Sequence, residues 1–188
     1  MKKYLVIGNP IDHSLSPKLH TYWIKKYDLR AKYTKYLLEE RNLEDVVKQI
    51  RDNKIDGFNV TVPFKKKIIP YLDHLSPIAK KANSVNTVYK LNNKVIGDNT
   101  DIDGFLKSLN AINFDPKNKI AFIIGAGGVS LSIIVALKKM GVSKLKITNR
   151  TNSETMLLKK KYPELEIIDW GKNSDFDIII NATSLGLE

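Results

Sequence analysis

The chain contains no cysteine and only three histidines. The absence of cysteine excludes a disulfide framework, a thiolate nucleophile and a Cys-ligated metal. The histidines, His13, His20 and His74, lack the spacing that places two metal ligands on one face of a helix. We therefore expect no metal site.

Long apolar runs and low-complexity tracts are missing as well. No run approaches the roughly 20 residues that span a bilayer, and the residues after Met1 lead into a short strand rather than the core of a signal peptide. We therefore expect a cytoplasmic protein with no membrane contact. Its 188 residues, 43% hydrophobic and 27% charged, predict one globular domain or two small ones.

Acidic residues are fewer than basic ones, 20 against 31, which leaves a net charge of +11. Such an excess is typical of nucleic-acid binding when it gathers on one face. Here it is spread over the chain, and the lysine runs at 65–67 and 159–161 lack the interleaved aromatic residues of RNA-binding motifs. We expect no nucleic-acid partner, although a diffuse positive field steers anionic small molecules toward the protein.

Strand and helix patterns alternate through the first half of the chain. Ser16, followed by Pro17, and Asn42 are expected to cap the first two helices. The last two strands of this half are expected to form a hairpin. Strands are predicted at 3–8, 31–37, 57–62, 85–91 and 94–97, and helices at 16–27, 43–51, 77–82 and 103–111.

The second half is predicted to be a separate domain after a polar linker, placed at 113–118 or in the preceding helix. Continuous β-branched runs indicate a parallel sheet covered on both faces. The expected fold class is α/β, with a doubly wound second domain; such a sheet usually has six strands, so this domain is either small or incomplete. Its strands are expected at 119–124, 144–148, 165–168 and 177–180, with helices at 129–140 and 153–161.

A glycine-rich turn from Gly125 to Ser130 follows the first strand of the second domain and opens a helix. Gly125 allows the tight turn, and Gly127 lets backbone N–H groups approach a pyrophosphate at the helix N-terminus. Ser130 replaces the third glycine of the usual dinucleotide fingerprint. The motif predicts nucleotide binding; a turn that serves only the fold is the simpler alternative.

The end of the next strand indicates which dinucleotide is bound. An Asp or Glu there holds the ribose of NAD, but the chain has Asn149, Arg150 and Thr151. The Arg150 guanidinium can fork onto a 2′-phosphate, and its neighbours offer further hydrogen-bonding groups. We therefore predict NADP as the cofactor, against the alternative of an exposed arginine without a ligand.

In the first domain, polar residues stand at the carboxyl ends of strands, where α/β folds hold ligands. Ser14 and Ser16 bracket a helix N-terminus, which suits a carboxylate, although by themselves they are better explained as turn and capping residues. Alternation puts Asn59 and Thr61 on one face of a strand, with Lys65 just beyond. The same pattern recurs at Asn86 and Thr87 and at Asn99, Thr100 and Asp101.

Taken in order, these segments resemble the successive motifs of the shikimate dehydrogenase family. Several matches in sequence order are far more specific than any one, and they favour ligand binding by Ser14 and Ser16 over capping alone. The matching segments, which run over the whole chain, are 8–20, 57–65, 83–88, 97–105, 125–128, 149–151 and 181–186.

The resemblance implies an α/β substrate domain at 1–103 and a Rossmann-like NADP domain at 104–188. It implies NADPH-dependent reduction of 3-dehydroshikimate to shikimate, on the route to chorismate and aromatic amino acids, by a monomer or homodimer. Ser14 and Ser16 would hold the substrate carboxylate. The ring hydroxyls would be bound by Thr61, Asn86 and Asp101, in a substrate site that also includes Asn59. Lys65, which also binds substrate, and Asp101 would form the catalytic pair.

The resemblance also implies a set of cofactor-binding residues and some departures from the family. Thr21 stands where asparagine is usual, and Val129 and Leu131 stand where small and often basic residues are usual. The family continues beyond the position of Glu188, so a polypeptide ending there is expected to aggregate and to lack activity. The implied cofactor residues are Gly125, Ala126, Gly127, Gly128, Val129, Asn149, Arg150, Thr151, Asn181, Ala182, Thr183 and Ser184.

Alternatives stay open. A quinate/shikimate dehydrogenase would accept NAD as well as NADP, which Arg150 disfavours. A non-catalytic basic nucleotide-binding module would explain the net charge but not the polar residues at the strand ends. An inactive fragment is the third possibility.

Overall fold

The structure, a computed structural model, describes residues 1–186 and divides into two compact units, Met1–Thr100 and Asp101–Glu188. The predicted boundary between residues 103 and 104 lies within the first helix of the second unit. The polar stretch at 113–118 is a loop inside that unit rather than a linker between the units.

The first unit alternates strands and helices as the sequence predicts. The predicted strands at 57–62 and 85–91 are shorter than expected, and β4 and the two 3-10 helices have no predicted counterpart. In chain order the elements are β1 (Lys2–Gly8), α1 (Ser16–Lys26), β2 (Ala31–Leu37), η1 (Glu40–Asn42), α2 (Leu43–Arg51), β3 (Gly57–Val60), η2 (Ile69–Tyr71), β4 (His74–Leu75), α3 (Pro77–Ala82), β5 (Thr87–Leu91) and β6 (Lys94–Asp98).

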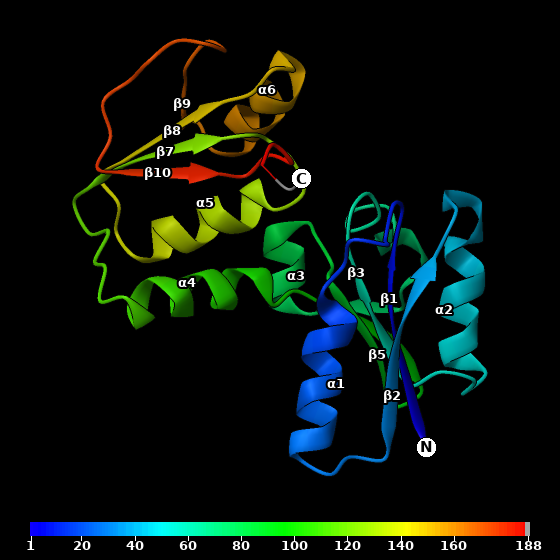
Figure 1. Cartoon of the computed structure of the whole chain (residues 1–188). Helices are drawn as coiled ribbons and strands as arrows, with labels where there is room; N and C mark the ends of the chain where they lie inside the picture. Colours follow the sequence, from blue (N-terminus) through cyan, green and yellow to red (C-terminus); the bar gives the residue numbers. More distant parts are fainter. Residues whose placement is uncertain (187–188) are drawn as a thin grey trace. The chain divides into compact units, whose positions relative to one another are not determined.

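These strands form one sheet in the order β2-β1-β3-β5-β6-β4. β1 runs parallel to both β2 and β3, whereas β5 is antiparallel to β3 and to β6. The β5–β6 hairpin turns at Asn92 and Asn93, both with the positive φ that a two-residue type I′ turn requires. Because β2 and β3 lie on opposite sides of β1, right-handed crossovers put α1 and α2 on opposite faces of the sheet (Figure 1).

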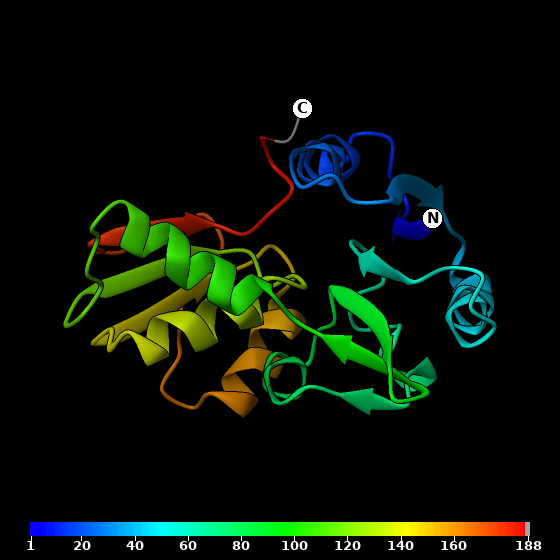
Figure 2. The ribbon, with the colours of Figure 1, turned by 90° about the horizontal axis from the view of Figure 1, so that it is seen from below.

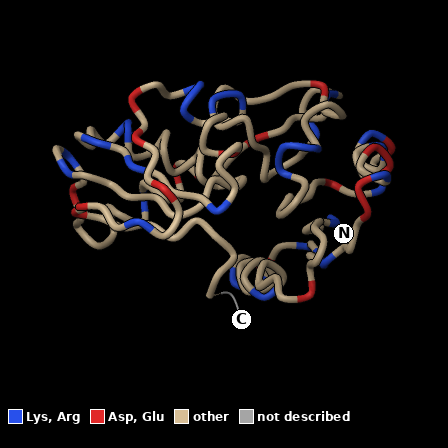
Figure 3. The backbone as a smooth tube through the Cα atoms, turned by 90° about the horizontal axis from the view of Figure 1, so that it is seen from above, with Lys and Arg blue, Asp and Glu red and all other residues tan. Residues whose placement is uncertain are grey.

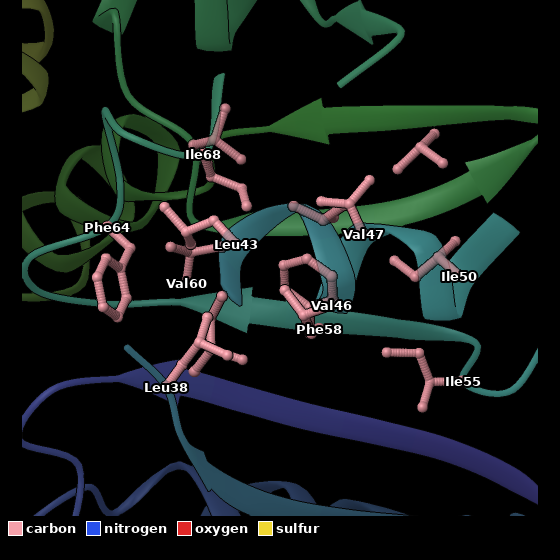
Figure 4. Packing of buried hydrophobic residues seen from close by; sticks show 14 of the residues in the cluster. Leu38, Leu43, Val46, Val47, Ile50, Ile55, Phe58, Val60, Phe64 and Ile68 are labelled. Carbon is pink, nitrogen blue, oxygen red and sulfur yellow. The ribbon is translucent and has the colours of Figure 1, made fainter. Parts of the chain in front are cut away.

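The face toward α2 holds the main hydrophobic core of this unit. Val46, Val47 and Ile50 of α2 are fully buried and belong to one cluster with Phe58 and Val60 of β3 (Figure 4). The spacing of these apolar positions along the chain matches one face of a helix, which is why the segment is helical. Burial of each such side chain contributes about 1.5–3 kcal/mol, so this core fixes β3 in place.

The face toward α1 carries a smaller cluster of Val6, Ile11 and Tyr33, against which Ile24 of α1 packs. Tyr33 is only 7% exposed. Since Phe58 and Val60 point toward α2, alternation along β3 turns Asn59 to the α1 face. A polar side chain and a buried phenol therefore share this side of the sheet.

Two predicted helix caps are wrong in detail. Ser16 is the first residue of α1, because Leu15 occupies the N-cap position in a helical conformation, and no side chain caps this helix. Ser14 Oγ accepts from the Ser16 N–H at 3.3 Å in the turn before the helix. Asn42 occupies the cap position of α2, but its side chain makes no capping hydrogen bond. Its backbone, at φ −100° and ψ 10°, lacks the extended conformation that aims a cap side chain at the helix.

The second unit is built on a parallel sheet in the order β10-β7-β8-β9, as its β-branched runs predict. Its elements are α4 (Asp101–Ala111), β7 (Ile120–Ile124), α5 (Ser130–Lys139), β8 (Lys144–Thr148), α6 (Asn152–Lys161), β9 (Glu166–Ile167) and β10 (Ile178–Asn181). Figure 2 shows α4 and α5 running side by side. The three helices share one core with the sheet, including Leu109, Ile123, Ile134, Leu137, Ile147 and Leu158.

The other face of this sheet lacks the expected helical cover within residues 1–186. The chain between β9 and β10 lies there instead: the rings of Phe176 and Phe122 are 6.1 Å apart, and Lys146 Nζ forms an ion pair with Asp175. Ile179 of the edge strand β10 remains 48% exposed. The face is nevertheless covered, since Phe122 and Lys146 are 5% and 2% exposed, but within residues 1–186 a loop rather than a helix covers it.

Within residues 1–186, no helix combines the length and apolar character needed to cross a membrane. Lysine and arginine residues occur along both units rather than in one region (Figure 3). The basic excess is therefore dispersed, as the sequence indicates.

Candidate active site

The strand directions bring the polar segments of the first unit to one edge of its sheet. β1 and β3 are parallel, so their carboxyl ends, at Gly8 and Val60, lie at the same edge. β5 runs the other way, which places its first residue, Thr87, beside Asn59, and β6 returns to this edge at Asp98. The segments that adjoin these strand ends carry the predicted substrate residues.

Ser14 and Ser16 lie where the turn after β1 enters α1. Ile11 O accepts a hydrogen bond from the Ser14 N–H at 3.0 Å, and Ser14 Oγ accepts from the Ser16 N–H. Both serines are half-buried. Two hydroxyls thus stand beside the first turn of a helix, where the backbone dipole favours a negatively charged group.

Asn59 is held by three hydrogen bonds within the fold. Its Oδ1 accepts from the Tyr33 hydroxyl at 2.6 Å, and its Nδ2 donates to Asn86 O at 3.1 Å and to Thr87 Oγ1 at 3.2 Å. A half-buried amide needs such partners, because an unpaired one costs about 1–3 kcal/mol. These bonds tie β3 to the segment that opens β5.

Asn86 is fixed through both its backbone and its side chain. Its N–H donates to Asp98 O, and its carbonyl accepts from the Val60 N–H. Its Oδ1 accepts from the Thr100 N–H at 3.0 Å, and its Nδ2 donates to Thr100 Oγ1 at 2.9 Å. The carboxamide is therefore held at the sheet edge, between the ends of β3 and β6.

Thr61 and Lys65 lie in the turn that follows β3. The Thr61 N–H donates to Ile7 O at 3.0 Å, and its Cγ2 comes so close to Gly8 that a Cβ there would meet it at 2.5 Å. Lys65 O accepts from the Val85 N–H at 2.8 Å, which ties the backbone of Lys65 to the segment before Asn86. The Lys65 side chain is half-buried.

Asp101 is the first residue of α4 and belongs to the second unit. It follows Thr100, the hydrogen-bond partner of Asn86, and it is half-buried. A carboxylate in the first turn of a helix is stabilised by the helix dipole. The structure thus brings the other predicted substrate residues together within the first unit and places Asp101 at the start of the second.

In the second unit the glycine turn follows β7 and leads into α5. Gly125 has φ +107°, and a Cβ on it would lie 2.9 Å from the carbonyl atoms of Ala182. Ser130 Oγ donates to Gly125 O at 2.8 Å, so this serine braces the turn in place of the third glycine. Among residues 1–186 no protein acceptor is found for the N–H groups of Gly127 and Gly128, and such donors before a helix suit phosphate oxygens.

The segment after β8 borders the same turn. The Asn149 side chain accepts from the Ala126 N–H at 3.2 Å and donates to Thr151 O at 2.9 Å. Its carboxamide is therefore engaged in shaping the loop. Arg150 is exposed, as a cation that binds a phosphate from solvent must be. Val129 precedes α5 without a side-chain cap.

The segment after β10 lies against the glycine turn. The Ala182 N–H donates to Ile124 O at 2.7 Å. Asn181 Oδ1 accepts from both the N–H and the hydroxyl of Thr183, at 3.0 and 2.7 Å. Ser184 is exposed beside them. The three predicted cofactor segments are thus neighbours at the carboxyl end of this sheet.

Tyr33, whose hydroxyl donates to Asn59 of the candidate site, was not identified from the sequence. Burial raises the pKa of the Tyr33 phenol far above its usual range, against a smaller lowering by a side-chain hydrogen bond with Ser16. Its ring stacks on that of His20 with centroids 4.1 Å apart. Tyr33 lies between Lys32 and Thr34 in a strand, a pattern that predicts only an inward-facing residue, so the sequence carried no signal for this role.

Known proteins of one family resemble the chain. Residues 6–88 match the family model described as the shikimate dehydrogenase substrate binding domain. A shikimate dehydrogenase (NADP(+)) from Pelagibacter ubique is 59% identical over 187 residues, which cover 100% of this chain and 71% of that protein.

Solved structures show the same likeness over both units. Shikimate dehydrogenase from Aquifex aeolicus has a TM-score of 0.91 and 39% identity, with 100% of this chain and 71% of that one covered. Shikimate 5-dehydrogenase from Thermus thermophilus, in complex with NADP(H) and shikimate, has a TM-score of 0.88 and 30% identity, with 98% and 69% covered.

Proposed function

Because the chain belongs to the shikimate dehydrogenase family, we propose that it is an NADP-dependent oxidoreductase that interconverts 3-dehydroshikimate and shikimate in the synthesis of aromatic amino acids. The observation that carries this function is the 59% identity to an NADP-dependent shikimate dehydrogenase across the whole chain. The fold agrees, since a relative with a TM-score of 0.88 holds NADP(H) and shikimate.

The edge of the first sheet is the substrate site in this proposal. Shikimate carries one carboxylate and several ring hydroxyls. The hydroxyls of Ser14 and Ser16, at the start of α1, suit the carboxylate. The ring hydroxyls are assigned to Thr61, Asn86 and Asp101 as hydrogen-bonding partners. Asn59 holds Asn86 in place by the hydrogen bonds described above, in addition to the substrate contact that the sequence predicts.

One proton and one hydride must reach the substrate carbonyl. NADPH supplies the hydride when it is bound. The Lys65 ammonium donates a proton to the carbonyl oxygen as negative charge develops there, so that the C=O becomes C–OH. Asp101 is the predicted catalytic partner of Lys65, as the resemblance to the family implies. In the reverse direction Lys65 takes up the proton released by the hydroxyl.

The second unit has residues that fit NADP. The N–H groups of Gly127 and Gly128 stand before α5, ready for pyrophosphate oxygens. Arg150 supplies a forked cation for the 2′-phosphate, where an NAD-binding protein would have a carboxylate. The likeness of the whole chain to NADP-dependent enzymes supports this assignment.

The family model over residues 6–88 supports a division of labour in which the first unit binds shikimate and the second binds NADP. The predicted domain ranges, the cytoplasmic location, and assembly as a monomer or homodimer stay predictions.

Initial rates with each substrate and each cofactor test the function. We expect the highest kcat/KM with shikimate and NADP⁺ together. Comparable values with quinate or with NAD⁺ would instead identify a quinate/shikimate dehydrogenase. Salt-dependent DNA affinity without any turnover would favour a non-catalytic basic module.

A further inference from the structure

Tyr33 lies on β2, next to β1, with its side chain on the face that α1 covers. Its hydroxyl donates to Asn59 Oδ1 at 2.6 Å across the width of one intervening strand. The residue is 7% exposed. Because the hydroxyl donates here, it provides the Asn59 carboxamide oxygen with the partner that a half-buried acceptor requires.

The same side chain also meets α1, because its ring stacks on that of His20. Burial raises the pKa of the Tyr33 phenol, and the Ser16 side chain at the start of α1 lowers it by a smaller amount. Tyr33 thus contacts α1 through its ring and the end of β3 through its hydroxyl.

The orientation of Asn59 passes on to Asn86. With its Oδ1 turned to Tyr33, Asn59 Nδ2 points to Asn86 O and Thr87 Oγ1, at 3.1 and 3.2 Å. A flipped carboxamide would set its oxygen against Asn86 O, which only accepts, so the bond between Asn59 and Asn86 would be lost. The Tyr33 hydroxyl stabilises the observed arrangement, in which Asn59 supports Asn86, by donating to Oδ1.

The ring of Tyr33 is itself fixed. It stacks on His20 of α1 at a centroid distance of 4.1 Å with an interplanar angle of 6°. Burial keeps the phenol protonated, since it raises the pKa above the usual range. The hydroxyl thus remains a donor at every pH at which an enzyme is assayed.

We propose that Tyr33 is a positioning residue of the substrate site, whose hydroxyl holds Asn59 and, through Asn59, Asn86 for binding of the substrate ring hydroxyls. This proposal rests on the proposed function, which assigns Asn59 and Asn86 to the substrate site. Tyr33 itself touches the side chains that hold the substrate and takes no part in proton transfer.

Tyr33→Phe removes the hydroxyl and retains the ring against His20. We expect the KM for shikimate to rise by about 5–30-fold, the effect of one or two lost hydrogen bonds, with kcat and the KM for NADP changed by less than about threefold. Tyr36→Phe is the matched control, since Tyr36 lies on the same strand and is 41% exposed. It should leave all three constants unchanged.

Asn59→Ala and the double variant with Tyr33→Phe measure coupling between the two residues. If Tyr33 acts through Asn59, the two losses of shikimate affinity in calorimetry are less than additive. Additive losses would overturn the proposal, because Tyr33 would then act independently of Asn59. A lower melting temperature for Tyr33→Phe with unchanged KM for shikimate would also overturn it, because that result describes a residue that serves stability alone.

Asn59→Asp covers the case in which Tyr33→Phe does not fold. It keeps an oxygen that accepts from Tyr33 but loses the donor to Asn86, so we expect the same selective rise in the KM for shikimate. An unchanged KM in this variant contradicts the proposal. A wild-type protein that binds no shikimate in calorimetry would instead refute the proposed function, which separates the two failures.

Discussion

The side-chain oxygen of Ser14 accepts a hydrogen bond from the backbone N–H of Ser16 at 3.3 Å. This bond reverses the expected roles of the two serines in folding. Ser14→Ala should lower the free energy of unfolding by about 0.5–1.5 kcal/mol, the usual net contribution of one hydrogen bond. Ser16→Ala should lower it less. Urea denaturation of the two variants measures both values, and a larger loss in Ser16→Ala would contradict the assignment.

Each of these serine variants should also bind shikimate more weakly, by roughly 1–2 kcal/mol, the scale of one hydrogen bond to a charged group. Calorimetric titration of shikimate into each variant measures this loss. Intact affinity in both variants would return the serines to a purely structural role.

Gly125 and Gly128 give a matched pair in the glycine turn. Gly125→Ala should destabilise the second unit by about 1–3 kcal/mol, because a side chain at φ +107° is strained and its Cβ would lie 2.9 Å from Ala182. Gly128→Ala meets nothing within 4 Å and should leave stability nearly unchanged. Thermal unfolding of both variants tests this, and equal melting temperatures would contradict the described turn.

Arg150→Ala should raise the KM for NADP by about tenfold or more, the effect of a lost charged hydrogen bond, while the KM for NAD changes little. Lys160→Ala removes the same charge from α6 of the same unit and controls for the diffuse positive field. Steady-state kinetics with both cofactors distinguish the cases. Equal effects of Arg150→Ala on NADP and NAD would show that Arg150 serves the fold.

His20 gives the first unit a pH-dependent stability. Burial lowers the pKa of its imidazole below the usual value of about 6.5, so the unfolded chain binds a proton that the folded chain resists. Stability should therefore fall as the pH drops below about 6.5. His20→Gln should flatten this slope in urea denaturation between about pH 7.5 and about pH 5. Exposed His74→Gln is the control; an unchanged slope in His20→Gln would rule out this role.

Local elements could be predicted from the sequence because they depend on neighbouring residues. The predicted bounds of α2, α3 and β8 agree with the structure. The order of the first sheet could not be predicted in the same way. The antiparallel β5 beside β3 and the short β4 beside β6 depend on pairings between residues far apart in the chain.

In the candidate site, too, features that depend on neighbouring residues could be predicted and features that depend on distant residues could not. The residues that carry hydroxyl, amide or ammonium groups at strand ends could be found from their types and spacing. The residues that hold these groups in place could not be found, since Asn59 accepts its hydrogen bond from Tyr33, 26 residues away in the chain. The N-cap of α1 was likewise misplaced by one residue, since Leu15 rather than Ser16 occupies that position.

Lys65 tests the proposed chemistry most directly. The test uses stopped-flow measurement of NADPH formation from shikimate and NADP⁺, together with calorimetry of shikimate binding. Both measurements are made on the wild type, on Lys65→Ala and on the exposed neighbour Lys66→Ala. The proposed function predicts that Lys65→Ala lowers the rate by a factor on the order of 10²–10⁴ while shikimate affinity stays within a few-fold, and that Lys66→Ala matches wild type. An unchanged rate in Lys65→Ala would contradict it, because the proton would then be transferred by another group.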